Sequence, residues 1–245
     1  MRGFWTLTWT EFKLFLREPA AMFFTLAFPL MLLFMFGAIF GNDRSGEADG
    51  HGAVDISVPG YMAMIIGTTT IMSIPIVISE YRNQGIFRRL RATPLRPVAI
   101  IGAQVVIYFV MTVLGFILLY IGGRLVFDLM TPEQPVKLFG VLLLSFVSMA
   151  AMGFLIGSYF KTSRTASVVG NIVYFPQIFL AGAALPREIM SDTMKRWTEW
   201  LPLTQVVNMI KQAWWSEPIS WWSILYLAVL GLVCFVISTK VFKWE

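Results

Sequence analysis

The chain has 245 residues, of which 57% are hydrophobic and 13% are charged, and its mean hydropathy is +0.72. Soluble domains carry about 25% charged and about 45–50% apolar residues, so this composition excludes a soluble globular domain, a disordered chain and a nucleic-acid-binding module. The one cysteine, Cys234, lies in an apolar run, which excludes a disulfide framework and a cysteine-based metal site. We therefore predict an all-α membrane protein with a single transmembrane domain over residues 1–245.

Residues 1–19 have the pattern of an amphipathic helix that lies in the membrane interface. Trp5, Trp9, Phe12 and Leu16 recur at spacings of four, three and four, which places them on one helical face. The polar and basic residues lie largely off that face. Two interpretations stay open: a simple anchor, or a lever that a cytoplasmic partner can push.

Six apolar stretches are each long enough to cross about 30 Å of hydrocarbon as a helix. Their length and continuity favour helices over the alternating ten-residue strands of a membrane barrel. They contain no Asp, Glu, Lys, Arg or His, which disfavours an ion-coupled carrier or an intramembrane enzyme. The predicted spans are residues 20–41, 58–79, 98–121, 138–159, 165–185 and 219–239.

The basic residues predict which side of the membrane each connecting segment occupies. Segments 1–19, 80–97, 160–164 and 240–245 hold twelve of the nineteen Lys and Arg residues and four of the fourteen acids. The opposite segments hold seven basic residues and ten acids. Because positive charge is retained on the cytoplasmic side, we predict that both termini are cytoplasmic.

Catalytic and cofactor-binding patterns are absent from the sequence. His51, the only histidine, lies in a Gly-rich acidic loop and is interpreted as a solvated loop residue, so no metal site is predicted. No GxxxxGK[ST] loop occurs, so we expect no nucleotide binding by this chain. If the protein moves a substrate uphill, the energy must come from another polypeptide.

The predicted cytoplasmic loop 80–97 combines a basic cluster with a short helical pattern. Ile86 and Leu90 share one helical side, and Pro94 and Pro97 end the helix. A loop that only fixes the membrane topology needs a basic cluster beneath the membrane. That role does not require Glu80, Gly85 and the Thr93-Pro94 break together.

This loop resembles the type-2 permeases of ATP-binding cassette exporters, which include daunorubicin-resistance-like drug permeases and polysaccharide exporters. The family pattern, roughly E-R-E-x-G-T-L-E-R-L-R-x-T-P-L, matches Glu80, Arg82, Gly85, Arg89, Leu90, Arg91, Thr93, Pro94 and Leu95, and departs at Tyr81, Asn83, Ile86 and Phe87. Two further regions are similar in the same order: Arg17-Glu18-Pro19 with Phe28-Pro29 and Phe36-Gly37, and Phe175-Pro176 through Pro186 with Trp200 to Thr204.

The resemblance implies a multi-pass permease of the bacterial plasma membrane that forms a homodimer or a heterodimer and works with two ATPase subunits, which bind the ATP and Mg. It also implies that the loop is a coupling helix that docks on the ATPase. The implied interface residues are Glu80, Arg82, Gly85, Phe87, Arg88, Arg89, Leu90, Arg91, Thr93 and Pro94.

The predicted external segment 186–218 contains two apolar helical faces. One is formed by Met190, Met194, Trp197 and Leu201, and the other by Val206, Val207, Ile210 and Trp214. Two short amphipathic helices that dip into the outer leaflet explain both, and the resemblance likewise implies re-entrant or external helices. A plain lipid-facing hairpin is the alternative.

Polar and aromatic residues within the spans are candidates for a substrate path, although each also suits a helix–helix contact. These candidates are Thr68, Thr69, Met72, Asn171, Tyr174, Phe175 and Phe179. We expect export of a hydrophobic or amphipathic substrate such as a drug, antibiotic or lipid. A permease for a polysaccharide or lipid-linked glycan is the main alternative, and a membrane scaffold or sensor is less favoured.

Overall fold

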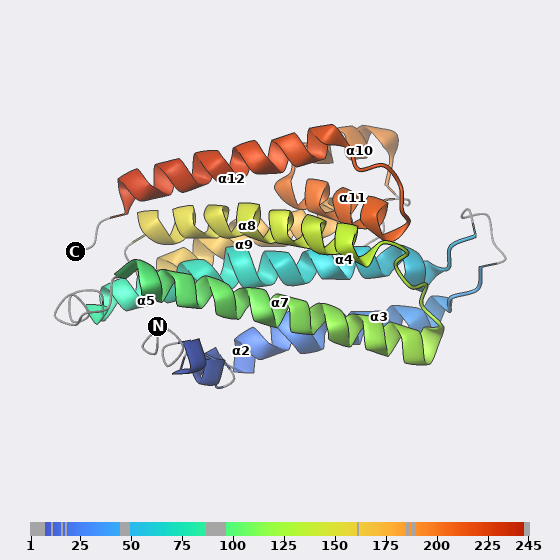
Figure 1. The fold of residues 1–245 in the computed structure, drawn as a ribbon, viewed down its shortest axis with the longest axis horizontal. Helices are drawn as coiled ribbons and strands as arrows, with labels where there is room; N and C mark the ends of the chain where they lie inside the picture. The colour runs from blue at the N-terminus through green and yellow to red at the C-terminus, as the bar shows by residue number, and fades with distance from the viewer. Residues whose placement is uncertain are drawn as a thin grey trace.

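The computed structural model describes residues 8–10, 12–15, 17, 19–44, 50–86, 97–160, 162–184, 187 and 190–242. Within these ranges the chain is helical and contains no strand. Figure 1 shows the long helices side by side and roughly antiparallel, with α4 in the middle, α12 at one edge and α2–α3 at the opposite edge.

Several consecutive elements join into longer helices. The first consists of α2 (Pro19–Met22), a π-helical segment η1 (Phe23–Ala27) and α3 (Phe28–Phe40). The second consists of α4 (Ala53–Gly67), a π-helical segment η2 (Thr68–Ser73) and α5 (Ile74–Asn83). The remaining elements are α7 (Pro97–Phe127), α8 (Pro135–Tyr159), α9 (Ser163–Leu180), α10 (Asp192–Thr198), α11 (Pro202–Trp214) and α12 (Trp221–Val241).

Five of these helices are long and apolar enough to cross a membrane, where the sequence predicts six. They are Phe23–Phe40, Ala53–Asn83, Ile101–Phe127, Pro135–Tyr159 and Trp221–Val241. The predicted span 165–185 forms α9, which has 18 residues but is less apolar because it contains Arg164, Asn171 and Gln177. Helix α9 still packs beside α5, η2 and α8. That the chain crosses the membrane six times stays a prediction.

Several helices extend beyond their predicted spans and take in charged residues. The helix predicted over 58–79 runs from Ala53 to Asn83 and includes the buried Asp55, and α7 continues to Phe127 and includes Arg124. The segments predicted as cytoplasmic adjoin helix ends at one end of the bundle, and α10 and α11 lie at the other (Figure 1). The orientation of this bundle in a membrane stays a prediction.

Both π-helical segments occur just before a proline. Pro29 and Pro75 are each the second residue after a π segment, within the first turn of α3 and of α5. Proline has no backbone N–H and its ring collides with the carbonyl four residues earlier, so a wider π turn accommodates it within a continuous helix. The two segments also contact each other, which places both irregular turns at one level of the bundle.

Glycines let α8 and α9 approach η2 closely. A Cβ on Gly153 of α8 would collide with the backbone carbonyl oxygen of Thr70, and one on Gly170 of α9 would lie 2.8 Å from that of Ile71. Backbone atoms inside a packed helix cannot easily move aside, so the contact of both helices with η2 requires these glycines.

The N-terminal residues 8–10 and 12–15 are helical and attach to the bundle through Phe15. Its ring is buried and meets Tyr108 of α7 edge-on, with ring centroids 5.9 Å apart. Trp9 is 58% exposed, stacks on Phe12 at 5.4 Å and has Lys13 Nζ 5.5 Å from its ring. Trp5 and Leu16 lie outside the described residues. The aromatic face predicted from the sequence does not include Phe15, whose buried ring packs this segment against α7.

Candidate functional site

Arg82, in the last turn of α5, caps the C-terminal end of α8. Its guanidinium donates hydrogen bonds to the carbonyl oxygens of Ser158, at 2.9 Å, and of Phe160. The Ser79 hydroxyl donates to the same Phe160 oxygen at 3.1 Å. The last carbonyls of a helix lack partners within the helix and carry partial negative charge, so a cation is well placed there. Arg82, predicted to face an ATPase, is thus engaged within its own chain.

Glu80 connects α5 to the first residue of α9. Its carboxylate accepts a hydrogen bond from the Gln84 side chain at 2.5 Å, and the hydroxyl of Ser163 lies close enough to stabilise its charged form. Ser163 begins α9, and the positive end of the helix dipole favours a carboxylate at that place.

Tyr81 makes the third connection, to α7. The side-chain amide of Gln104 donates a hydrogen bond to the Tyr81 hydroxyl oxygen at 2.8 Å. Three consecutive residues thus join α5 to α9, α7 and α8 respectively. We name residues 80–82 the triple-contact motif.

Gly85 ends α5 immediately before the rest of the predicted coupling loop. Its φ is +64°, a left-handed conformation that glycine adopts without strain, and its N–H donates to the Arg82 carbonyl at 3.1 Å. A Cβ at this position would meet no atom within 4 Å, so only backbone conformation restricts the residue type. The other predicted interface residues lie outside the described residues: Phe87, Arg88, Arg89, Leu90, Arg91, Thr93 and Pro94.

Thr68 and Tyr174, predicted to line a substrate path, bind each other inside the bundle. Their hydroxyl oxygens are 2.6 Å apart, and each lies within hydrogen-bond distance of the Met64 carbonyl oxygen, at 2.9 and 2.7 Å. Both side chains are at most 3% exposed. Thr69 is fully buried and lies 3.0 Å from the Thr112 hydroxyl of α7. These contacts favour a role in helix packing for all three.

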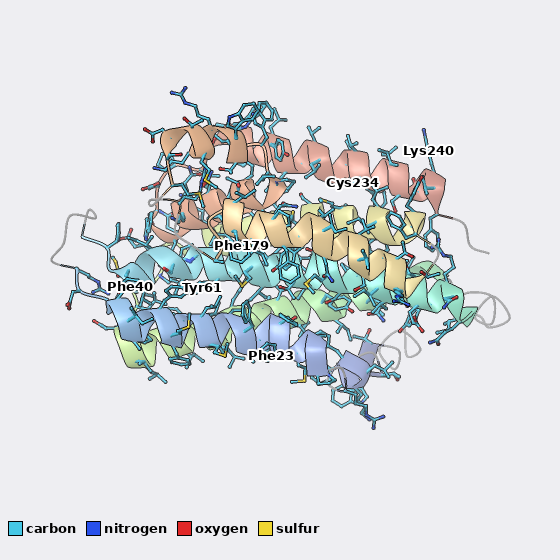
Figure 2. The ribbon with its side chains drawn as sticks, turned by 180° about the vertical axis from the view of Figure 1, so that it is seen from behind. Phe23, Phe40, Tyr61, Phe179, Cys234 and Lys240 are labelled. Carbon is cyan, nitrogen blue, oxygen red and sulfur yellow. The ribbon has the colours of Figure 1, made fainter. Side chains whose placement is uncertain are left out.

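The other predicted path residues divide by exposure. Met72 packs at the edge of the core, and Asn171 is half-buried, with a side-chain oxygen that has no hydrogen-bond partner. Phe175 and Phe179 are exposed and share one face of α9 with Val168 and Ile172, at helical spacings of four, three and four. Phe179 is labelled on α9 in Figure 2. The candidate path thus separates into an interior cluster and an uncovered apolar face.

A polar clasp closes the opposite end of the bundle and has no counterpart in the predicted site. The fully buried carboxylate of Asp55 pairs with Arg44 Nε at 3.1 Å and accepts from the Met130 N–H at 2.8 Å. Asn42 accepts from the N–H groups of Val54 and Asp55 at the start of α4. The α3–α4 connection, the start of α4 and the α7–α8 connection are thereby held together.

Comparison with known proteins identifies the family of the chain. The sequence model described as ABC-2 type transporter matches residues 2–215. The chain belongs to the ABC-2 type transporter family. A Bacillus subtilis (strain 168) protein described as "Putative transport permease YvfS" is 26% identical over 197 residues, which cover 78% of this chain and 77% of that protein.

Family membership identifies the chain as a multi-pass membrane transport component and implies, in general, an ATP-binding cassette ATPase as partner of this ABC-2 permease. It confirms the resemblance drawn from the loop 80–97. Sequence reasoning missed the partners of the triple-contact motif, which are Gln104, Ser163 and the carbonyl groups at the end of α8. No local sequence pattern marks these groups, because only the fold brings them next to residues 80–82.

Proposed function

We propose that this ABC-2 permease is the membrane-spanning subunit of an exporter that moves a hydrophobic or amphipathic substrate, such as a drug, an antibiotic or a lipid, out of the cytoplasm or inner leaflet. In this proposal two separate ATPase subunits bind ATP and Mg and dock on the loop 80–97. The observation that carries it is the triple-contact motif, since a push on the loop reaches three helices through three adjacent residues.

The π-helical segment η2 supports a route from that motif to the interior. It continues directly into α5, and its Thr70 and Ile71 carbonyls pack against glycines of α8 and α9. A π turn inside an α-helix is rare and is frequently found at functional sites. In the proposed mechanism a movement of α5 changes the packing of η2 against α8, α9 and the neighbouring η1.

The proposed substrate path lies between two copies of the permease, or between it and a close homologue. One chain has too few helices to enclose a path by itself. Phe175 and Phe179 on the uncovered face of α9 are the proposed lining residues, because their rings are 43% and 53% exposed. Thr68, Thr69 and Tyr174 are assigned to holding the helices that carry this face.

The experiment is reconstitution in lipid vesicles with a candidate ATP-binding cassette ATPase from the same genome. We expect co-purification, and ATP hydrolysis that rises when a hydrophobic substrate is added. Reversal of Arg89 and Arg91 to Glu places like charges at the proposed interface and is expected to lose the ATPase. Lys240→Glu, which reverses another basic residue predicted to be cytoplasmic, is the matched control. If R89E/R91E keeps the ATPase and the parental export rate, the loop is only a topological charge cluster.

A further inference from the structure

Four exposed tryptophans gather where α10, the turn before α11 and the first turn of α12 meet. Trp197, Trp200, Trp221 and Trp222 are 78%, 66%, 82% and 53% exposed. The Trp200 and Trp222 ring centroids are 5.9 Å apart, and the Tyr226 hydroxyl donates to the Trp200 carbonyl oxygen at 2.6 Å. The turn after α10 is thereby tied to α12. We name the four residues the outer tryptophan patch.

The protein itself covers little of this apolar surface. On α10, Thr198 is buried, whereas Met194 and Trp197 are exposed. The charged residues Asp192, Lys195 and Arg196 lie on the remaining faces. A helix with an apolar face that is turned away from the protein and charged flanks has the pattern of an element that lies in a membrane interface.

The patch continues an apolar face that runs along α12. This edge helix packs on α8 and α11, and only 22% of its apolar window is buried in the protein. Leu225, Val229, Leu232 and Phe235 are among its exposed residues. In a multi-pass membrane protein such a face contacts acyl chains, and tryptophans collect where such a face reaches the headgroups.

The length of α12 indicates which of its residues lie at the boundary between the hydrocarbon core and the lipid headgroups. Its 21 residues span about 31 Å at 1.5 Å per residue, close to the roughly 30 Å thickness of the hydrocarbon core. If α12 crosses the bilayer, Trp221 and Trp222 in its first turn lie at the headgroup level. Trp200 lies at the same level because it packs against Trp222.

We propose that the outer tryptophan patch lies among the lipid headgroups of the outer leaflet and anchors the α10–α11 connection there. The partner is the lipid surface. A sugar-binding platform fits less well, because the Trp200 and Trp222 rings stand at 88° to each other and present no common flat face. The proposal rests on membrane insertion and on the predicted orientation of the bundle, and it is independent of the substrate that is exported.

The test uses the full chain with Cys234→Ser, in vesicles of phosphatidylcholine and phosphatidylglycerol. Single cysteines replace Trp197, Trp200, Trp221 and Trp222 in turn and carry a nitroxide label, whose collisions with oxygen and with a water-soluble nickel complex report its depth. We expect all four labels at the headgroup boundary. Val229→Cys, on the exposed face of α12, is the deep control, and Asp192→Cys, on a charged face of α10 where the side chain is 93% exposed, is the water-exposed control.

Two results would overturn the proposal. Labels as accessible to nickel as the Asp192→Cys label would place the patch in water, where it is free for a soluble ligand. Labels shielded from both reagents, with spectral broadening between spins, would place it against a second copy of the chain. A further measurement uses a label at Met194→Cys: adding W197A and W200A is expected to move it toward water, and an unchanged depth would show that these tryptophans anchor nothing.

Discussion

The guanidinium of Arg82 donates a hydrogen bond to the carbonyl oxygen of Ser158 at 2.9 Å, although 76 residues separate them. This contact joins a residue near the start of the predicted coupling loop 80–97 to the end of α8. It changes the interpretation of Arg82 from a group that faces another subunit to one that holds two helices of its own chain.

Replacing Arg82 tests this interpretation. Arg82→Ala leaves carbonyls at the end of α8 without their charged donor, and we expect a loss of about 1.5–3 kcal/mol of stability, reduced by partial exposure to solvent. Arg82→Lys should recover only part of it, because an ammonium group lacks the planar fork of donors. Thermal unfolding in detergent measures both, with Lys240→Ala as control. Unchanged stability in Arg82→Ala would mean that the contact is dispensable.

The cost of replacing Gly85 is expected to depend on how well the new residue adopts a left-handed φ, and not on the size of its side chain. Gly85→Ala should cost about 1–2 kcal/mol because of the left-handed φ, and Gly85→Asn should cost less. The control is Gly140→Ala in α8, where open space surrounds the Cβ and φ is not left-handed, so no loss is expected. Thermal midpoints compare the three variants, and equal midpoints would contradict the argument.

Tyr174 and Phe179 are expected to respond in opposite ways. Tyr174→Phe removes a buried hydroxyl that binds Thr68 and Met64, so we expect a loss of about 0.5–1.5 kcal/mol in stability. In the Tyr174→Phe variant, the substrate concentration that gives half-maximal stimulation of the ATPase should stay unchanged. Phe179→Ala should keep the thermal midpoint and change that concentration. The reverse pattern would return Tyr174 to the substrate path.

Pro75→Ala is expected to impair coupling while the ATPase remains bound. Alanine supplies the N–H that proline lacks, which removes the reason for the wide turn at η2 and favours an ordinary α-helix. We therefore expect lower stimulation of ATP hydrolysis by substrate in reconstituted vesicles. Pro176→Ala in α9, which lies in a helix without a π segment, is the control. Parental stimulation in Pro75→Ala would exclude a role for the η2 geometry.

Asp55→Asn should destabilise the end of the bundle that the polar clasp closes. The amide carries no charge to form an ion pair with Arg44 and has one acceptor oxygen where the carboxylate has two, so we expect a loss of about 1–3 kcal/mol. Asp128→Asn is the matched control, because its side chain is 75% exposed although it also approaches Arg44, at 3.9 Å. Thermal unfolding compares the two, and a similar loss in both would show that burial of Asp55 does not matter.

Local pattern was enough for the class of protein and for much of the helix layout. Composition and long apolar runs predicted a helical membrane protein, and five of the six predicted spans correspond to helices able to cross a membrane. Hydropathy is a sum over neighbouring residues, so it can be read without knowing the fold. The order of motifs around Glu80 and Gly85 predicted the permease family in the same way, because a family pattern is itself a local sequence property.

The partners of individual side chains depended on the tertiary structure. Thr68 and Tyr174 each looked like a polar residue available to substrate, yet they are 106 residues apart and satisfy each other. Arg82 looked like a surface cation, yet the end of α8 lies within its reach. A buried hydroxyl or guanidinium takes whichever donor or acceptor the packing brings within about 3 Å, and helix packing is set by the whole chain and not by the residues on either side.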